Sequence, residues 1–221
     1  LNGIERVCKT ADVNPNEISQ VMHGTTVATN TILTGTGAKV GLVTTKGYKQ
    51  VLQIARSYVP GGLGGWVIYN KSEPLAPLAC TIEAEERTGA DGKVVRQLKK
   101  PALKTELKRL KNENIEALTV SLVNSYANAK HEKEIGKVAK ETLPGIPVSL
   151  SSDVVPEMQE YERTITTVAN SYVRPKVATY VRSLQRKLTR KMKNVKLHIL
   201  RSDGGMASSK VAESLPVNLL M

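Results

Sequence analysis

The residues whose types and spacing best suit chemistry lie between positions 23 and 30, where the chain reads His-Gly-Thr-Thr-Val-Ala-Thr-Asn. They join a short apolar stretch to a helical pattern, and such a junction leaves backbone N–H groups free at the positive end of the helix dipole. The hydroxyls of Thr25 and Thr26 add movable donors, and Thr29 and Asn30 follow about one turn later. The segment predicts a site for an anion or a carbonyl oxygen. A well-capped helix with a structural histidine is the alternative.

A second turn of interest, Arg201-Ser202-Asp203-Gly204-Gly205, follows an alternating stretch at 195–200. The two glycines permit backbone conformations that other residues avoid. The Asp203 carboxylate can bind a magnesium-held phosphate directly or through water. A plain hairpin or capping turn is the commoner meaning of such a sequence, so both interpretations stay open.

Charged residues also crowd the start of a long helical pattern between 157 and 163. Glu160 offers a carboxylate for acid or base chemistry, and Arg163 offers a cation for an anion. Solvated ion pairs are the more usual meaning of such a cluster. The three histidines have no metal-ligand spacing, which excludes a structural zinc site. A nucleophile elbow and a P-loop are also absent from the sequence.

Alternating strand and helix patterns must position these residues. Strands are predicted around 21–22, 39–44, 117–123, 148–150 and 195–200, and helices over 3–11, 31–33, 48–56, 101–111, 128–142 and from Pro156 towards Met192. Pro175 is expected to kink or break the last helix. A hairpin is predicted with strands 81–87 and 94–98, and the apolar end, 215–221, looks strand-like. This rhythm predicts an α/β fold with a mostly parallel sheet and covering helices.

Composition narrows the function classes. The net charge of +12, with lysines and arginines gathered between 99 and 111, favours anionic partners. One Trp, seven Tyr and no Phe are too few rings for a single-strand binder, so no nucleic-acid partner is expected. No stretch approaches the roughly 18 apolar residues of a membrane span. Two distant cysteines and the lack of a secretory signal predict a cytoplasmic location without disulfides.

Three segments together resemble the hydantoinase A/5-oxoprolinase family. They are His23 to Asn30 with Ala38 to Gly47, Val155 to Pro175, and Leu200 to Met206, in family order along nearly the whole chain. The loop around Val59 to Trp66 is most similar to the acetone and acetophenone carboxylase branch. Asp203 stands where many members have Asn, which leaves its role between hydrogen bonding and metal binding.

The resemblance implies an actin-like, sugar-kinase-like (ribonuclease H-like) ATPase fold, with a mixed sheet and covering helices, incomplete in this chain. Residues 1–155 would form most of the N-terminal hydantoinase/oxoprolinase domain, including a glycine- and proline-rich loop at 57–80. Residues 156–221 would supply the long helix and the start of the hydantoinase A domain. A glycine-rich phosphate segment should precede Leu1 and an SGPAGG segment should follow Met221, so the chain by itself is expected to hydrolyse ATP weakly or not at all.

The resemblance also implies cofactors, substrates and roles. ATP and Mg would activate the carbonyl or enol oxygen of a lactam, a hydantoin, or a ketone that reacts with bicarbonate, with a second, hydantoinase B-type subunit as partner. The implied catalytic residues are His23, Thr25, Thr26, Asn30, Glu160 and Arg163, and the implied cofactor residues are Gly24, Thr29, Asp203, Gly204 and Gly205, with Asp203 towards Mg. A non-catalytic, actin-like assembly module that docks a partner through its basic surface is the alternative.

Overall fold

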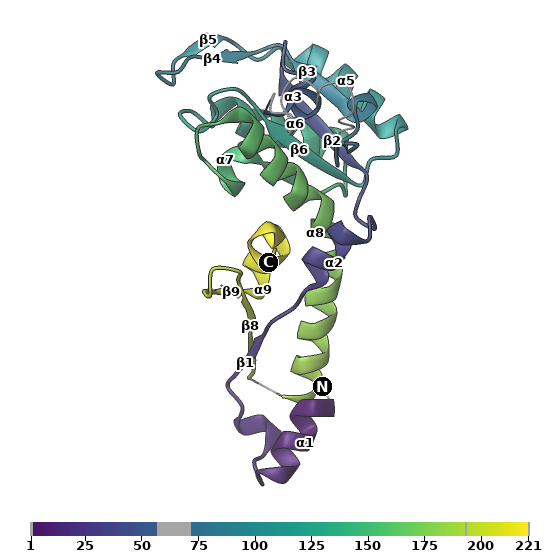
Figure 1. Ribbon diagram of the computed structural model, residues 1–221, viewed down its shortest axis with the longest axis vertical. Coiled ribbons are helices and arrows are strands. Elements are labelled where there is room, and N and C mark those ends of the chain that lie inside the picture. The colour runs from purple at the N-terminus through teal and green to yellow at the C-terminus, as the bar shows by residue number, and fades with distance from the viewer. Residues whose placement is uncertain (1, 57–71, 193, 221) are drawn as a thin grey trace, which may run out of the picture. The chain divides into compact units, whose positions relative to one another are not determined.

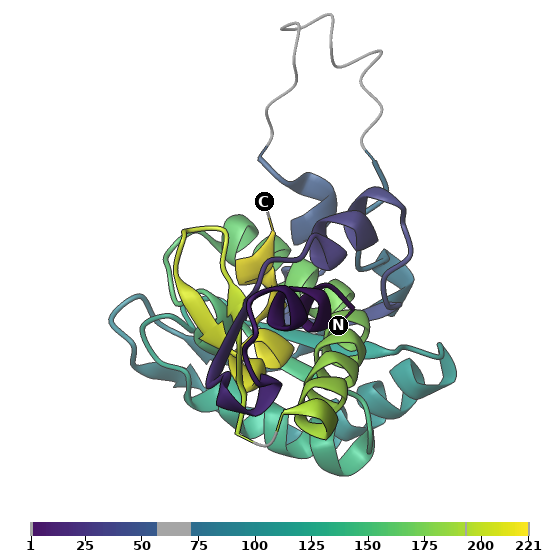
Figure 2. The ribbon, with the colours of Figure 1, turned by 90° about the horizontal axis from the view of Figure 1, so that it is seen from below.

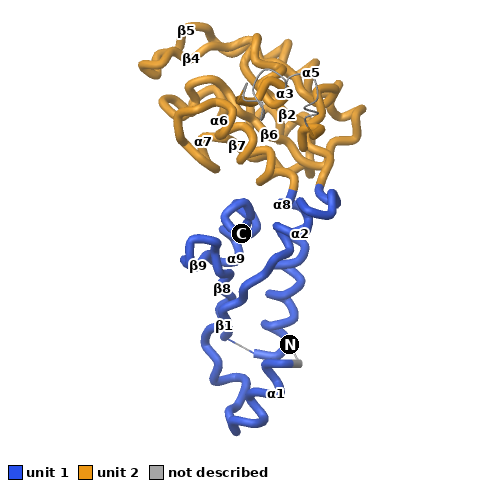
Figure 3. Tube along the Cα trace, in the orientation of Figure 1, with its two compact units in different colours: residues 1–37, 173–221 blue, residues 38–172 orange. Residues whose placement is uncertain are grey.

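The computed structural model describes residues 2–56, 72–192 and 194–220, and the chain divides into two compact units (Figures 1 and 3). Unit 1 comprises residues 1–37 and 173–221, and unit 2 comprises residues 38–172. Most of the predicted loop at 57–80 lies outside the described residues. Because the first and last parts of the chain meet in unit 1, the compact units do not follow chain order. The predicted domain boundary near residue 155 stays a prediction.

Unit 2 is built on a parallel four-stranded sheet of order β3-β2-β6-β7. The strands are β2 (Val40–Thr45), β3 (Thr81–Ala84), β6 (Ala117–Ser121) and β7 (Val148–Leu150). Every residue of the two central strands, β2 and β6, is buried. Their short apolar runs are what a strand covered on both faces requires, and the predicted α/β class with a mostly parallel sheet is confirmed.

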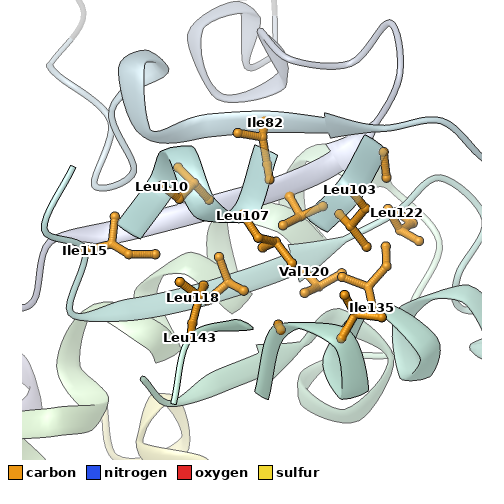
Figure 4. Close-up of a cluster of buried hydrophobic side chains, with 14 of the residues drawn as sticks. Ile82, Leu103, Leu107, Leu110, Ile115, Leu118, Val120, Leu122, Ile135 and Leu143 are labelled. Atoms are coloured by element: carbon orange, nitrogen blue, oxygen red, sulfur yellow. The ribbon is translucent and has the colours of Figure 1, made fainter. Parts of the chain in front are cut away.

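Helices α5 (Lys100–Asn112) and α6 (Lys130–Thr142) bury their apolar faces in the hydrophobic core of unit 2 (Figure 4). Leucines recur along α5 at the spacing of one helical face, and all of them are buried. The same cluster contains Leu118 and Val120 of β6, with Ile135 of α6. Alternate residues of β6 therefore point to these helices, and the remaining ones point to the opposite face of the sheet.

Gly41, on the central strand β2, is required by close packing. An added Cβ would lie 2.8 Å from Ile115 Cδ1 and within 3.3 Å of two leucine methyl groups. We expect Gly41→Val to lower the free energy of unfolding by about 1 to 3 kcal/mol, as overpacking of a core does. Gly3→Val is the control, because nothing lies within 4 Å of that position. Denaturant unfolding measures both, and an equal loss in the two variants would contradict the packing argument.

The predicted hairpin forms, but its first strand is shorter than expected. Strand β4 (Arg87–Thr88) pairs antiparallel with β5 (Val94–Arg96) across a turn in which Gly92 has φ 78°. The stretch predicted as one strand at 81–87 is wrong in extent, because Thr81–Ala84 joins the parallel sheet instead. Glu86, between the two strands, turns its carboxylate into the protein interior and separates them.

Helix α8 (Glu160–Lys191) follows the short helix α7 (Ser151–Val154) and contributes to both units. Pro175 was predicted to kink or break this helix. A break is wrong, because the helix is continuous through Pro175. Proline removes one main-chain N–H from the helix. The fully buried Val173 and Val177 on either side supply packing that outweighs this loss.

Unit 1 contains a three-stranded mixed sheet of order β1-β8-β9 (Figure 2). Its elements are α1 (Asn2–Thr10), η1 (Pro15–Glu17), β1 (Gln20–His23), α2 (Val27–Leu33), β8 (Lys196–Leu200), β9 (Met206–Ser208), α9 (Ser209–Ser214) and η3 (Pro216–Leu219). Strand β1 is parallel to β8, and β9 returns antiparallel to β8. Ser208 caps α9 by accepting a hydrogen bond from the Val211 N–H, and serine is a favoured residue at the start of a helix.

Two further expectations differ from the structure. The strand-like end at 215–221 is wrong, since Pro216 starts a 3-10 helix, which its fixed φ favours. The helix predicted at 48–56 is only α3 (Val51–Ile54), which ends where Ala55 takes φ 52°. A 3-10 turn, η2 (Leu78–Cys80), precedes β3. Both cysteines are buried free thiols. Among the described residues, no helix combines the length and hydropathy needed to cross a bilayer.

Candidate functional site

The two turns singled out in the sequence lie at one edge of the unit 1 sheet. Strand β1 runs parallel to β8, with His23 opposite Ile199. The turn at 24–26 leaves the carboxyl end of β1, and the turn at 201–205 leaves the carboxyl end of β8. The carboxyl ends of adjacent parallel strands form one edge, where α/β proteins commonly bind ligands. The topology therefore brings the two predicted half-sites together.

The turn at Thr25 and Thr26, called the Thr25–Thr26 corner, has polar side chains that are accessible to solvent. Thr26 is the N-cap of α2 but makes no side-chain capping bond. Its Oγ1 instead accepts a hydrogen bond from Asn30 Nδ2 at 3.3 Å, and Thr25 Oγ1 accepts one from the Val27 N–H at 3.3 Å. Thr26 and Asn30 are exposed, whereas Thr29 is half-buried. Three of the predicted residues thus form a compact, accessible group at the helix start.

His23 ends β1 beside this corner, and its ring nitrogen already has a partner. Nε2 lies 2.6 Å from the hydroxyl of Tyr180 on α8, and the two rings are 5.9 Å apart. Partial burial lowers the pKa of His23 below its usual value, which favours the neutral imidazole. Sequence reasoning missed Tyr180, because no motif includes it and it lies 157 residues away.

The Asp203 turn is a tight connection between β8 and β9. Asp203 Oδ1 accepts the Gly205 N–H at 2.9 Å, and Oδ2 pairs with Arg201 at 2.6 Å. Gly204 has φ 82°, a conformation that favours glycine. The segment therefore forms a hairpin turn, which was one of the two interpretations of its sequence. Each carboxylate oxygen has further lone pairs that a water or a metal can use.

The η3 segment connects the two corners. It contacts α2, and its Asn218 carbonyl accepts the Ser202 N–H at 2.9 Å. Gly24 is not forced by crowding, since an added Cβ would meet only Leu200 Cδ1 at 3.7 Å. Within the described residues, no group of three or more histidine, cysteine or acidic side chains is placed to hold a metal. The assignment of Asp203 to Mg stays a prediction.

Of the two predicted residues in unit 2, Glu160 lies in the wall of a cavity. The cavity has a volume of about 700 Å³ and lies where β2 ends and α8 begins. Glu160 is the first residue of α8 and is half-buried. A carboxylate in the first turn of a helix interacts favourably with the positive end of the helix dipole.

Arg163, one turn later, is buried and tied to the backbone. Its NH1 donates to the Glu157 carbonyl at 2.7 Å and its NH2 donates to the Leu122 carbonyl at 2.8 Å. Its Nε donates to Ser151 Oγ, and its guanidinium lies over the Tyr126 ring. With 1% of its surface exposed, Arg163 is not a member of a solvated ion-pair cluster. These contacts fix the segment that leads into Glu160.

Two buried carboxylates in unit 2, those of Glu86 and Glu132, were not predicted from the sequence. Glu132 of α6 accepts hydrogen bonds from the Leu122 N–H, the Ser152 N–H and the Ser151 hydroxyl at 2.7 to 2.9 Å. Glu86 accepts a hydrogen bond from Thr45 and lies 2.7 Å from His131 Nδ1. The helix that carries His131 and Glu132 reads as polar, but both side chains are buried.

The basic cluster on α5 is locally neutralised. Lys99 pairs with Glu85, Lys100 with Glu134, Lys104 with Glu141, and Arg109 with Glu106. Exposed pairs of this kind contribute little stability. They do reduce the positive field that six basic residues between 99 and 111 would otherwise produce.

Two family models match the chain. The model described as "Hydantoinase/oxoprolinase N-terminal region" matches residues 1–143, and the model described as "Hydantoinase/oxoprolinase" matches residues 163–221. This chain belongs to the hydantoinase/oxoprolinase family. Both corners of the unit 1 sheet edge lie in matched regions, the Thr25 junction in the first and the Asp203 turn in the second.

Named relatives of this hydantoinase/oxoprolinase chain include enzyme subunits. An uncharacterized protein of Methanocaldococcus jannaschii is 32% identical over 98% of this chain and 31% of its own length. The caprolactamase subunit alpha of Pseudomonas jessenii is 27% identical over 99% of this chain and 32% of its own length. The acetophenone carboxylase gamma subunit of Aromatoleum aromaticum is 29% identical over 86% of this chain and 28% of its own length. The chain therefore spans about three tenths of the length of these relatives.

Solved structures share the fold. ATP-dependent caprolactamase from Pseudomonas jessenii superposes with a TM-score of 0.85 at 24% identity, over 98% of this chain and 33% of that one. Nucleotide-free acetone carboxylase superposes with a TM-score of 0.81 at 21% identity, over 92% of this chain and 30% of the carboxylase chain. These matches show that the chain shares its fold with the corresponding parts of the two enzymes, and the α/β class expected from the sequence is confirmed.

Proposed function

We propose that the protein carrying this chain uses ATP to activate a carbonyl or enol oxygen by phosphoryl transfer. The observation that supports this most directly is the meeting of two family segments, the Thr25–Thr26 junction and the Asp203 turn, at one sheet edge. Relatives named caprolactamase and acetophenone carboxylase make carbonyl compounds the natural substrate class. A lactam or hydantoin would be hydrolysed, or a ketone would be carboxylated with bicarbonate.

The residues at this edge suit such a reaction. Phosphoryl transfer relies on positioning and charge neutralisation more than on a protein nucleophile. Thr25, Thr26 and Asn30 would orient the substrate or the transferred phosphate with their hydroxyl and amide groups. His23, held by Tyr180, would donate a hydrogen bond or a proton from the imidazole nitrogen that Tyr180 leaves free.

ATP and Mg would be held at the Asp203 turn, at the same sheet edge. The free lone pairs of Asp203 and the backbone of Gly204 and Gly205 fit the magnesium-phosphate end of a nucleotide. Magnesium supplies charge neutralisation of the phosphates when it is bound. Because two relatives are named as alpha and gamma subunits, we also propose that a second subunit completes the enzyme.

The test is phosphate release from MgATP by the whole protein with its partner subunits. Separate reactions contain 5-oxoproline, caprolactam, hydantoin, or acetone with bicarbonate. One substrate class is expected to raise phosphate release about tenfold or more above ATP alone. Nucleotide binding with no stimulation by any of them would contradict the proposal and favour an assembly module.

A further inference from the structure

The cavity in unit 2 is a second place where a small molecule fits. Its described walls come from the turn after β2, from α3, from Leu78 and Glu83, and from Glu160 and Tyr161 of α8. Its volume of about 700 Å³ lies in the range of about 300 to 1,000 Å³ typical of ligand sites. These walls are distinct from the unit 1 sheet edge, because they share no residue with it.

The cavity wall contains an acidic and a basic side chain that have no ion-pair partner among the described residues. Among the described residues, neither Glu160 nor Lys49 forms an ion pair. The other acid in the wall, Glu83, already accepts the Gly47 N–H at 2.7 Å. The neighbouring Glu162 is paired with Arg56. Glu160 has the buried Arg163 charge nearby, but no described residue forms an ion pair with Glu160 or Lys49, so both side chains can contact a ligand.

Apolar surface accompanies these charges. Ile54 is 56% exposed and Leu78 is 37% exposed, and both line the cavity. Val51 lines it as well and is half-buried. Apolar side chains that remain accessible to water gain free energy when a hydrocarbon segment covers them, at about 25 cal/mol per Å². A purely ionic ligand would leave that gain unused.

We propose that this cavity binds an amino-carboxylate, with its ammonium group at Glu160, its carboxylate at Lys49 and its methylene chain on Ile54 and Leu78. Among zwitterions we choose an amino-carboxylate because the proposed function includes lactam hydrolysis, and the inference rests on that function. Hydrolysis of a lactam breaks the C–N bond, adds a hydroxyl to the carbonyl carbon and a proton to the nitrogen. The product carries both charges at neutral pH, so the cavity matches the chemistry of the ring-opened product.

Arg163 acts on this cavity as a positioning residue. It anchors the Glu157 carbonyl immediately before α8, where Gln159 takes φ 72°. Since a non-glycine residue at positive φ is strained, the anchor helps to hold the chain direction that presents Glu160. Its buried contacts with Leu122 and Ser151 keep it away from the ligand itself.

The test is calorimetric titration of the protein, without ATP, with 6-aminohexanoate, hexanoate and hexylamine. We expect saturable binding of 6-aminohexanoate and weaker binding of the two singly charged probes. Glu160→Gln should weaken 6-aminohexanoate and hexylamine about threefold to tenfold and leave hexanoate unchanged, because one charged contact is lost. Lys49→Gln should weaken 6-aminohexanoate and hexanoate and leave hexylamine unchanged.

Matched controls are Glu141→Gln and Lys108→Gln, which lie outside the cavity and should bind all three probes as the parent does. Absence of saturable binding up to about 10 mM overturns the proposal, and so does an equal loss for all probes in either cavity variant. Because the titration contains no ATP, its failure leaves the phosphoryl-transfer proposal intact. Conversely, loss of ATP-coupled turnover with unchanged titrations would leave this site intact.

Discussion

Glu132→Ala is expected to lower the free energy of unfolding by about 3 to 5 kcal/mol, the largest stability effect that we predict for a single side chain. Glu132 is fully buried and accepts two backbone N–H groups and the Ser151 hydroxyl. Ser151 in turn accepts from Arg163, so the carboxylate balances a buried guanidinium through one hydroxyl. Truncation would leave a buried charge and buried donors without partners.

Glu134→Ala is the matched control for this effect. Glu134 lies on the same helix but pairs with Lys100 at the surface, and exposed pairs are worth about 0 to 1 kcal/mol. Denaturant unfolding followed by circular dichroism compares the two variants. Glu132→Gln, which keeps one acceptor oxygen, should fall between them. An equal loss for Glu132→Ala and Glu134→Ala would show that the buried network does not hold unit 2 together.

Thr26→Ala and Asp203→Ala are each expected to reduce ATP-coupled turnover by about tenfold or more, as loss of transition-state stabilisation does. Thr26 is exposed at the start of α2 and Asp203 at the turn after β8, so neither change opens a cavity in the core. The measurement is substrate-stimulated phosphate release by the whole protein with its partner subunits. Unchanged turnover in both variants would refute the assignment of this sheet edge.

Controls separate chemistry from turn structure. Asp91 in the β4–β5 hairpin accepts the Lys93 N–H and pairs with the Lys93 side chain, much as Asp203 does with Gly205 and Arg201. Asp91→Ala should leave turnover within about twofold, since it alters a comparable turn elsewhere. Asp203→Asn keeps an oxygen for the Gly205 N–H but removes the charge. Retained turnover in that variant assigns hydrogen bonding to Asp203, and lost turnover assigns magnesium-phosphate binding.

Local sequence pattern was sufficient wherever an element depends on its own residues. The apolar runs of β2 and β6, the leucine face of α5 and the capping serine before α9 each follow from spacing and residue type. Element ends were less accurate, because they depend on distant partners. The strand predicted at 81–87 stops at Ala84, since β2 pairs only that far and the next residues leave the sheet.

Some residues of the candidate site could also be predicted from local sequence, and others could not. His23, the Thr25–Thr26 pair and the Asp203 turn could be predicted because they lie in short continuous segments with family character. Tyr180 and Glu132 could not, because each lies beside residues that are far away in the chain. Arg163 was predicted as an exposed anion binder or ion pair, but backbone carbonyls from separate loops enclose it.

The amino-acid order by itself determined the family, the alternation of strands with helices and the two turns that carry family residues. These features depend on interactions within a few residues, which periodicity and turn chemistry report directly. Only the tertiary structure decided that β1 lies beside β8, that the two ends of the chain share unit 1, and that acidic and basic side chains of polar-looking helices are buried. Burial and strand pairing result from the whole chain collapsing together, and a local window of sequence does not contain that information.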